Sequence, residues 1–432
     1  MKAIITQDPL IPVETALVTI LGKMTPVEPE LIPLTQGLGR ILAEPVISRA
    51  NVPPFPNSAM DGYAIIASDT AGASNQKPVI LKVIGNVPAG ASPSVKLTPG
   101  TVARIMTGAP VPAGTDAVVR FEETSEQIPP PEPVELADHE IMIFKPVSMG
   151  DNVRPIGEDI KEGQTILRSG HRLRPQDIGV LAAVGQAEVL VHRRPRVAIL
   201  ATGDELVDLD SPIGPGKIRN SNEYTQAAMV QKYGGEPLML GIARDTVADL
   251  TAKIRTGLAQ EVDLFLTSAG VSVGDFDIVK NVLAEEGEMQ FWQVAIKPGK
   301  PLAFGLLNHT RNGEVAHVPL IGLPGNPVAA MVAFEVFARP AILKLAGQET
   351  LEKNKLRARL DEEVTNSGRR HYMRGFVYLG EAEYHVTTRG SGVQVQGSGI
   401  LSSMVWANCL VVVPEGVTNL PAGAPVDVWV LD

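Results

Sequence analysis

The segment RVAILATGDEL, residues 196–206, decides the fold class of this chain of 432 residues. Its first part, Arg196 to Leu200, is a short apolar run with Val and Ile, which is typical of a strand buried on both faces. Its second part is polar and contains Gly203, as expected where a chain turns at the end of a strand. The segment therefore predicts a buried strand that ends in a polar loop.

The same succession of strand, polar loop and helix recurs along residues 193–346. We expect strands over 196–200, 237–242 and 263–267, and helices over 222–233, 246–258 and 276–286. Strands that alternate with helices predict a parallel, doubly wound α/β sheet. In such sheets ligands bind beyond the carboxyl ends of the strands, so the loops that follow the strands are the expected place for a site.

Three further regions accompany this α/β domain. Residues 51–149 hold short apolar runs between Pro and Gly turns and predict a small β-rich domain, and residues 347–432 predict a second β domain, barrel-like in form. Residues 1–50 and 150–192 are expected to pack together as a discontinuous, α-rich linker domain. Helices are expected there over 12–23, roughly 28–44, and 177–183.

The composition excludes several classes of protein. The chain carries a net charge of −10 and only one cysteine, Cys409. Net acidity argues against a nucleic-acid binder, which should show a basic patch. A lone cysteine allows no internal disulfide and fits a reducing compartment. The start of the sequence does not resemble a signal peptide, and the longest apolar stretch, 328–345, contains charged residues, so we expect a cytoplasmic protein without a membrane span.

The loops after the three predicted strands gather small and acidic residues. Residues 202–206, 243–245 and 268–277 follow these strands, and their small residues let backbone N–H groups approach a phosphate. The acidic residues are Asp204, Glu205, Asp245, Asp275 and Asp277. Because bare carboxylates would repel a phosphate, the combination predicts a divalent cation between them. Each Asp could instead only cap a helix, but three such loops on successive strands favour a site.

The segment IKPGKP, residues 296–301, is a second candidate site. Lys297 and Lys300 are held in a turn stiffened by two prolines, and stiffness lowers the entropy lost when an anion is bound. The alternative is an exposed charged loop. Apolar runs on both sides of the segment anchor the turn and favour the anion site.

A third candidate, GLPGNP over residues 322–327, leads directly into a helix expected over 328–346. Asn326 suits the N-cap and Pro327 suits the first turn. A helix start alone explains both residues. The functional alternative is that this helix N-terminus binds an anion.

The last domain contains two polar segments. Residues 368–374 concentrate positive charge, and residues 397–404 offer hydroxyl and turn N–H groups. Arginine beside hydroxyl groups can bind an oxyanion, although a solvated run of charge explains the first segment equally well. In the small β domain, residues 53–64 and 105–116 are polar segments to which spacing alone assigns no mechanism.

Taken in order, these motifs resemble the molybdopterin molybdotransferase family, the group of MoeA and the gephyrin E-domain. The matching segments cover nearly the whole chain: 57–64, 107–116, 157–159, 202–206, 268–277, 296–301, 322–327 and 398–404. The resemblance implies an elongated four-domain homodimer. Its doubly wound domain would be MogA-like, and its cleft would be shared between that domain and the second domain of the partner subunit.

The implied reaction converts adenylylated molybdopterin and molybdate, with Mg²⁺, into molybdenum cofactor and AMP. The implied protein partners are the adenylyltransferase and the apoproteins of molybdoenzymes. The catalytic residues would be Asp61 and Thr107, from across the subunit boundary, with Asp159, Glu205, Asp245 and Asp277, of which the last three would bind the metal. The substrate-binding residues would be Thr202, Gly203, Ser268, Gly270, Ser272, Gly274, Pro324, Gly325, Asn326 and Pro327. The molybdate pocket would comprise Lys297, Lys300, Arg369, Ser398 and Ser403.

Two other functions stay open on the sequence alone. The doubly wound domain by itself would suffice for a molybdopterin adenylyltransferase, which makes the adenylylated pterin from ATP. A non-catalytic scaffold, as part of gephyrin's role suggests, is the other alternative. The acidic set is complete in the sequence, which favours an enzyme over a scaffold.

Overall fold

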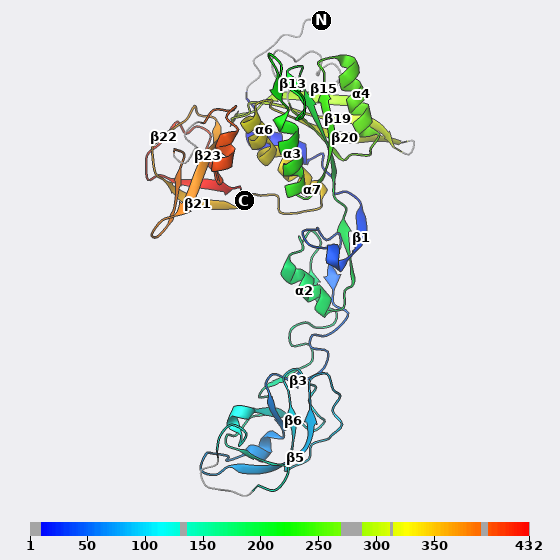
Figure 1. The fold of residues 1–432 in the computed structure, drawn as a ribbon, viewed down its shortest axis with the longest axis vertical. Helices are drawn as coiled ribbons and strands as arrows, with labels where there is room; N and C mark the ends of the chain where they lie inside the picture. Colours follow the sequence, from blue (N-terminus) through cyan, green and yellow to red (C-terminus); the bar gives the residue numbers. More distant parts are fainter. Residues whose placement is uncertain (1–9, 130–135, 269–286, 312–313, 390–395, 432) are drawn as a thin grey trace.

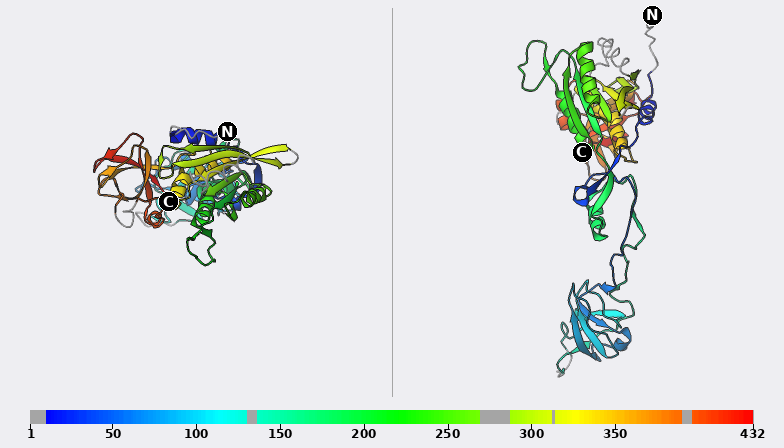
Figure 2. Two further views of the ribbon diagram at one scale, coloured as in Figure 1. Left: turned by 90° about the horizontal axis from the view of Figure 1, so that it is seen from above. Right: turned by 90° about the vertical axis from the view of Figure 1, so that its right-hand side faces the viewer.

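A computed structural model describes residues 10–129, 136–268, 287–311, 314–389 and 396–431 of the chain. The molecule is elongated (Figure 1). A small β domain lies at one end, an α/β domain and a second β domain lie side by side at the other end, and a narrow region connects the two ends. Figure 2 shows the same separation after a quarter turn. Any site in the α/β domain is therefore remote from the small β domain of the same chain.

The α/β domain is built on a six-stranded sheet with the order β15-β12-β16-β20-β19-β17. The strands are β15 (Glu236–Ala243), β12 (Arg196–Thr202), β16 (Leu264–Ser268), β20 (Glu314–Leu323), β19 (Pro301–Arg311) and β17 (Gly287–Gln293). The first four are mutually parallel, as predicted, whereas β19 and β17 are antiparallel to their neighbours. Arg311 pairs with Glu314, and so short a connection can join only antiparallel strands.

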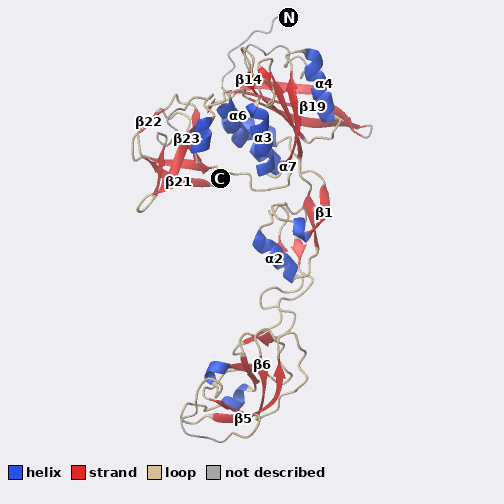
Figure 3. Cartoon of the chain, in the orientation of Figure 1, coloured by secondary structure: helices blue, strands red, loops and turns tan. Residues whose placement is uncertain are grey.

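Both faces of this sheet are buried, which confirms the doubly wound prediction. Along β12, Val197 and Ile199 face a core that includes α3 (Ser221–Lys232). Ala198 and Leu200 face the opposite core, formed with α4 (Val247–Leu258). Alternate burial on two faces explains why the strand has an unbroken apolar sequence. Most of the helix in the molecule lies in this domain (Figure 3). The helix predicted over 276–286 lies outside the described residues.

One helical segment follows β20 and belongs to the first core. It consists of α6 (Pro327–Ala333), a π-helical turn (Phe334–Ala338) and α7 (Arg339–Leu345), where the sequence predicted one uninterrupted helix. Pro340 has no N–H to donate to the preceding turn, and the wider π turn accommodates this break. Helix α1 (Val13–Leu21) packs in the same core through Val13, Ala16 and Ile20, although the sequence assigned it to the linker domain.

The connecting region contains strands where a helix was expected. The helix predicted over 28–44 is wrong: β1 (Pro29–Pro33) pairs with β11 (Glu188–His192), and a short 3₁₀ turn (Leu34–Gln36) follows. Prolines at both ends of β1 disfavour a helix, and Gly39 has a φ of +75° that ends any helical continuation. Helix α2 (Pro175–Ala183) is present close to its predicted position and packs with β1 and β11 in a small core.

The small β domain is a five-stranded sheet with the order β7-β4-β6-β5-β8. These strands are β7 (Ala117–Arg120), β4 (Gly62–Ile65), β6 (Thr101–Ile105), β5 (Val79–Val87) and β8 (Glu140–Ile143). Two-residue and three-residue strands join it to the connecting region: β2 (Val46–Ile47), β3 (Asn57–Ser58), β9 (Val153–Arg154) and β10 (Thr165–Leu167). Its buried core lies on both faces of the sheet, as predicted for a β-rich unit.

The C-terminal domain is a closed barrel, as predicted. Its strands are β21 (Lys355–Leu360), β23 (Arg370–Leu379), β24 (Tyr384–Thr387), β25 (Cys409–Val413) and β27 (Pro425–Val430). They close because β23 pairs with both β24 and β25. A short helix α8 (Ser402–Trp406) and the pair β22 (Val364–Thr365) and β26 (Asn419–Leu420) complete the domain. Tyr372 and Leu410 belong to the same core as the α/β domain, so the two domains are joined by apolar packing.

Among the described residues, no helix combines the length and the apolar character needed to cross a membrane.

Candidate functional site

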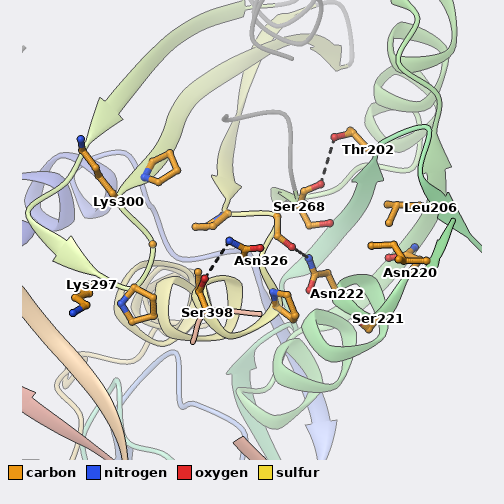
Figure 4. A pocket seen from close by; sticks show the side chains of 18 of the residues that line it. Thr202, Leu206, Asn220, Ser221, Asn222, Ser268, Lys297, Lys300, Asn326 and Ser398 are labelled. Atoms are coloured by element: carbon orange, nitrogen blue, oxygen red, sulfur yellow. Dashed lines mark hydrogen bonds between the residues drawn. The ribbon is translucent and has the colours of Figure 1, made fainter. Parts of the chain in front are cut away.

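A cavity of about 630 Å³ opens where the α/β domain meets the barrel. It lies at the carboxyl ends of β12, β16 and β20, where the sequence placed a site. Eleven of the predicted site residues line it: Thr202, Glu205, Ser268, Lys297, Lys300, Pro324, Gly325, Asn326, Pro327, Arg369 and Ser398. Residues from separate segments of the chain therefore converge on one cavity, which Figure 4 shows from close by.

The loop over 324–327 is fixed from two sides. Asn222 on α3 donates its Nδ2–H to the Gly325 carbonyl oxygen at 2.7 Å. Asn326 donates its Nδ2–H to Ser398 Oγ at 3.2 Å, and Val328 N–H donates to the Ser398 carbonyl oxygen at 3.0 Å. Pro327 is the first helical residue, as predicted, but the Asn326 side chain does not cap the helix because it bonds to the barrel instead. The loop thus ties the α/β domain to the barrel at the cavity.

The lysine turn is likewise held between domains. Ile296 and Lys297 form β18, a two-residue strand parallel to β23, in which Lys297 lies opposite His371. Arg369 donates from Nη1 to the Ile296 carbonyl oxygen at 3.2 Å. In Figure 4 the side chains of Lys297 and Lys300 lie well apart from each other along the turn. The two lysines therefore present their charges to different parts of the cavity.

The cavity is cationic in a protein that is acidic overall. Among the described residues, four positive side chains line it, Arg219, Lys297, Lys300 and Arg369, against one carboxylate, Glu205. The whole chain carries −10. His371, also in the wall, has a pKa lowered to about 3, by burial first and then by the charges of Lys297, Arg374 and Arg369. The cavity is thus arranged to bind an anion.

The acidic loop residues divide into three groups. Glu205 lines the cavity, and its carboxylate lies so close to Gly203 that a Cβ added there would displace it. Asp245 does not line the cavity; its Oδ2 accepts from the Asp204 N–H at 3.2 Å, and Asp204 Oδ1 accepts from the Asp245 N–H at 3.4 Å. Gly203 shapes the loop, with a φ of +141°, but is not part of the wall. The predicted site residues Gly270, Ser272, Gly274 and Asp277, with Asp275, lie outside the described residues.

Ser403 is not a wall residue, which corrects its assignment to the molybdate pocket. It is fully buried at the start of α8. Its Oγ accepts from Arg374 Nε at 3.0 Å and donates to the Ile400 carbonyl oxygen at 2.6 Å. Of the two serines considered from the sequence, Ser398 is the one that the fold places at the cavity.

Asp61, Thr107 and Asp159 are not at this cavity. Asp61 and Thr107 lie in the small β domain, at the far end of the molecule (Figure 1). Asp61 Oδ1 accepts from the Thr107 N–H at 2.7 Å and from its hydroxyl at 2.8 Å, and these bonds lower the pKa of the Asp61 carboxyl. Asp159 is exposed in the connecting region. The structure therefore pairs Asp61 with Thr107 but separates both from the cavity within one chain.

Several wall residues were not named individually from the sequence, although Leu206, Pro298, Gly299, Pro301 and His371 fall in segments that it singled out. The residues not named are Leu206, Ile218, Arg219, Asn220, Ser221, Asn222, Pro298, Gly299, Pro301, Ala329, His371 and Gln396. The polar run before α3 could have indicated a helix start at the site, because Asn is a common N-cap residue. Asn220 does cap that helix, by accepting from the Glu223 N–H. Glu223, buried beneath it, accepts from Asn220 Nδ2 at 2.6 Å and from the Gly241 N–H at 2.7 Å. Burial raises the pKa of Glu223.

Comparisons with known proteins agree along the whole chain. Three family models match: the MoeA N-terminal region (domain I and II) over 11–185, a probable molybdopterin-binding domain over 198–344, and the MoeA C-terminal region (domain IV) over 357–431. A molybdopterin molybdenumtransferase of Haemophilus influenzae is 37% identical, with 93% of this chain and 94% of the relative covered. The corresponding protein of Staphylococcus aureus is 34% identical, with 97% and 95% covered. A crystal structure of the MoeA protein of Pyrococcus horikoshii is 34% identical, has a TM-score of 0.79, and is matched over 98% of this chain and 100% of that chain.

Proposed function

Because the chain belongs to the molybdopterin molybdenumtransferase family, we propose that it inserts molybdate into adenylylated molybdopterin at the cavity between the α/β domain and the barrel, with release of AMP. In this reaction an oxygen nucleophile, from water or molybdate, cleaves the phosphoanhydride bond of the adenylylated pterin to give AMP and the pterin phosphate. The dithiolene sulfurs replace oxygen ligands of molybdenum, and these leave as water. The observation that carries the proposal is the cationic cavity in an acidic protein, since both substrates are anions.

The wall divides into two parts that suit the two substrates. The pterin and its phosphates would contact the ends of the sheet strands and the loop that begins α6: Thr202, Ser268, Pro324, Gly325, Asn326 and Pro327. The molybdate would contact Lys297, Arg369 and Ser398, which come together where β18 joins the barrel. The Arg369 guanidinium and the Ser398 hydroxyl are each fixed by a neighbouring hydrogen bond and are pre-organised for a tetrahedral oxyanion.

Mg²⁺ fits the acidic edge of the same cavity. Glu205 offers a carboxylate at the wall, and Asp245 lies on the neighbouring loop, where its carboxylate already receives the Asp204 N–H. Mg²⁺ is usually held by one or two carboxylates together with substrate phosphates, and bound there it would neutralise charge on the leaving phosphate. Glu205, Asp245 and Asp277 are the residues that we propose for it.

The second domain would complete the site from a partner subunit. Asp61, before β4, and Thr107, after β6, form a hydrogen-bonded pair between two exposed loops, remote from the cavity of their own chain. A homodimer in which each small β domain reaches the other subunit's cavity would bring this pair to the substrate. Asp159, in the connecting region, would lie along the same shared cleft.

The proposal is tested by anaerobic incubation of the purified protein with adenylylated molybdopterin, molybdate and Mg²⁺. We expect release of AMP together with cofactor that activates an apo-molybdoenzyme. A parallel incubation with molybdopterin and ATP tests the adenylyltransferase alternative. Formation of adenylylated pterin in the second incubation, without AMP release in the first, would replace the proposal by that alternative. Inactivity in both would favour the scaffold.

A further inference from the structure

His371 forms part of the cavity wall, yet none of the roles described above uses it. It lies on β23, with only 3% of its surface exposed, opposite Lys297 in the β18–β23 pairing. Its Nδ1 is enclosed by protein and finds no hydrogen-bond partner among the described residues. A buried imidazole at the edge of a polar cavity, with no partner for this nitrogen, is unusual enough to need an explanation.

The charges around the ring decide which nitrogen carries the proton. Lys297 faces the ring from β18, Arg369 from the preceding loop and Arg374 from β23 itself, and with burial they keep the imidazole neutral at pH 7. A neutral imidazole has one N–H and one lone pair. In a cationic wall an unpaired lone pair is attracted by its surroundings, whereas an unpaired N–H is repelled. The enclosed Nδ1 therefore carries the lone pair, and Nε2 carries the proton.

We propose that His371, through its Nε2–H, donates a hydrogen bond to the tetrahedral oxyanion beside Lys297 and Arg369, and is thus a specificity-determining residue of the molybdate subsite. Because Nδ1 is enclosed, Nε2 is the nitrogen that a ligand in the cavity can reach. Burial fixes the direction of the ring, so the donor selects for an anion that presents an oxygen at that point. This inference rests on the proposed function of the cavity.

Three substitutions separate the hydrogen bond from simple packing. His371→Gln places an amide N–H near the position of Nε2, His371→Asn places one near the enclosed Nδ1, and His371→Leu removes both. Binding of sodium molybdate, and of sodium sulfate as an inert tetrahedral dianion, is measured by calorimetry at pH 7. We expect His371→Gln to bind within about threefold of the wild type and the other two variants to bind at least about tenfold more weakly. AMP, which we expect to bind in the α/β part of the cavity, serves as the control ligand and should bind all four proteins alike.

A second readout is the pH dependence of the same titrations. A neutral donor predicts that the difference in affinity between wild type and His371→Gln stays constant from pH 6 to pH 8. A protonated imidazole would instead tighten binding to the wild type alone as the pH falls. That result, or equal molybdate affinity in all four proteins, or equal weakening in all three variants, would overturn the assignment. Absence of AMP release by the wild type would contradict the proposed reaction and is a separate outcome, since the titrations involve no turnover.

Discussion

At the scale of single residues, Glu335 shows how a carboxylate is held inside this protein. It lies in the π-helical turn, 3% exposed. Tyr233 donates its hydroxyl to Oε1 at 2.7 Å, and Lys353 donates its ammonium to Oε2 at 2.6 Å. Burial lowers the pKa of Lys353. Lys353 lies in the segment that leads to the barrel, so this ion pair ties that segment to the α/β domain.

We predict that Glu335→Ala lowers the free energy of unfolding by about 3–5 kcal/mol, because it leaves the Lys353 ammonium buried without its partner. The double variant Glu335→Leu with Lys353→Met should recover part of this loss, because the Lys353 charge is removed and the volume is kept. The recovery should be incomplete, because the buried Arg339 guanidinium, 3.6 Å from the Glu335 carboxylate, still loses that partner. Denaturant unfolding of the three proteins measures this. A double variant as unstable as Glu335→Ala would show that packing, and not the unpaired charge, determines the loss.

Asp177 gives a prediction for pH. Its carboxylate accepts from Arg174 Nε at 3.0 Å and from the Arg174 N–H at 2.8 Å, and it contacts His171 Nε2 at 2.8 Å. The hydrogen bonds from the Arg174 side chain are the largest cause of its lowered pKa. A carboxyl whose pKa is lower in the folded than in the unfolded protein stabilises the fold at pH values above its unfolded pKa. This contribution is lost as the pH falls below that value toward the folded pKa. The relevant window therefore begins near pH 4 and extends downward.

We expect Asp177→Asn to destabilise the connecting region by about 1–2 kcal/mol at pH 7, and the difference from the wild type to shrink as the pH falls from 4 to 2. Thermal unfolding at a series of pH values measures the difference. Glu44→Gln, an exposed carboxylate in the same region, is the matched control and should change little at any pH. A difference that is independent of pH would mean that the charge of Asp177 does not carry the effect.

At the scale of elements, the lysine turn depends on Gly299. This residue has a φ of +99°, and an added Cβ would lie 3.4 Å from the Ala329 carbonyl oxygen. Gly299→Ala should therefore displace the turn and weaken molybdate binding at least about fivefold, because a backbone in this region strains any side chain by about 1 kcal/mol or more. Gly416→Ala has a similar φ, +79°, with open space around it, and lies away from the cavity wall.

Calorimetric titration of molybdate into the two glycine variants gives the comparison. Both should lose similar stability, but only Gly299→Ala should lose affinity. Equal affinity in the two variants would mean that the shape of the turn does not matter for the anion.

The elements also show how far the sequence could lead. Buried strands such as β12 are predictable because an unbroken apolar run of this length, followed by a polar glycine loop, is too short for a buried helix. The helix expected over 28–44 was wrong because residues 29–33 form a strand that pairs antiparallel with β11, about 160 residues away along the chain. The sequence pattern within residues 28–44 contains no information about a partner strand so far away. The antiparallel strands β17 and β19 were also missed, although their partners are neighbours in the chain.

Site residues could be predicted where their neighbours in sequence form a distinctive motif. They could not be predicted where only tertiary packing determines which of several similar residues reaches the cavity. Lys297 and Pro327 are recognisable from their own neighbours in sequence. Ser398 and Ser403 are equivalent in sequence, and only the fold places Ser398 at the wall and Ser403 beneath it. His371 was missed because its position follows from the register of β18 against β23.

At the scale of the whole molecule, the separation of Asp61 from the cavity gives a prediction about assembly. Asp61→Ala and the cavity variant Glu205→Ala should each be inactive as pure dimers. In a mixed dimer, one of the two shared sites would combine an intact small β domain with an intact cavity. Co-refolding equal amounts of the two variants should therefore restore about a quarter of the wild-type rate, since half of the dimers are mixed and each has one intact site. Mixed dimers that are demonstrably formed but inactive would contradict a shared site.

The central claim is that the cationic cavity of the α/β domain and barrel binds molybdate for insertion into the pterin. It is tested most directly by measuring the initial rate of AMP release while molybdate is titrated, at saturating adenylylated molybdopterin and Mg²⁺. The wild type and Lys355→Ala, an exposed barrel lysine remote from the wall, should share one KM for molybdate. Lys297→Ala should raise that KM by at least about tenfold, while its KM for the adenylylated pterin stays within about threefold. An unchanged KM for molybdate in Lys297→Ala, or AMP release that does not depend on molybdate, would contradict the account.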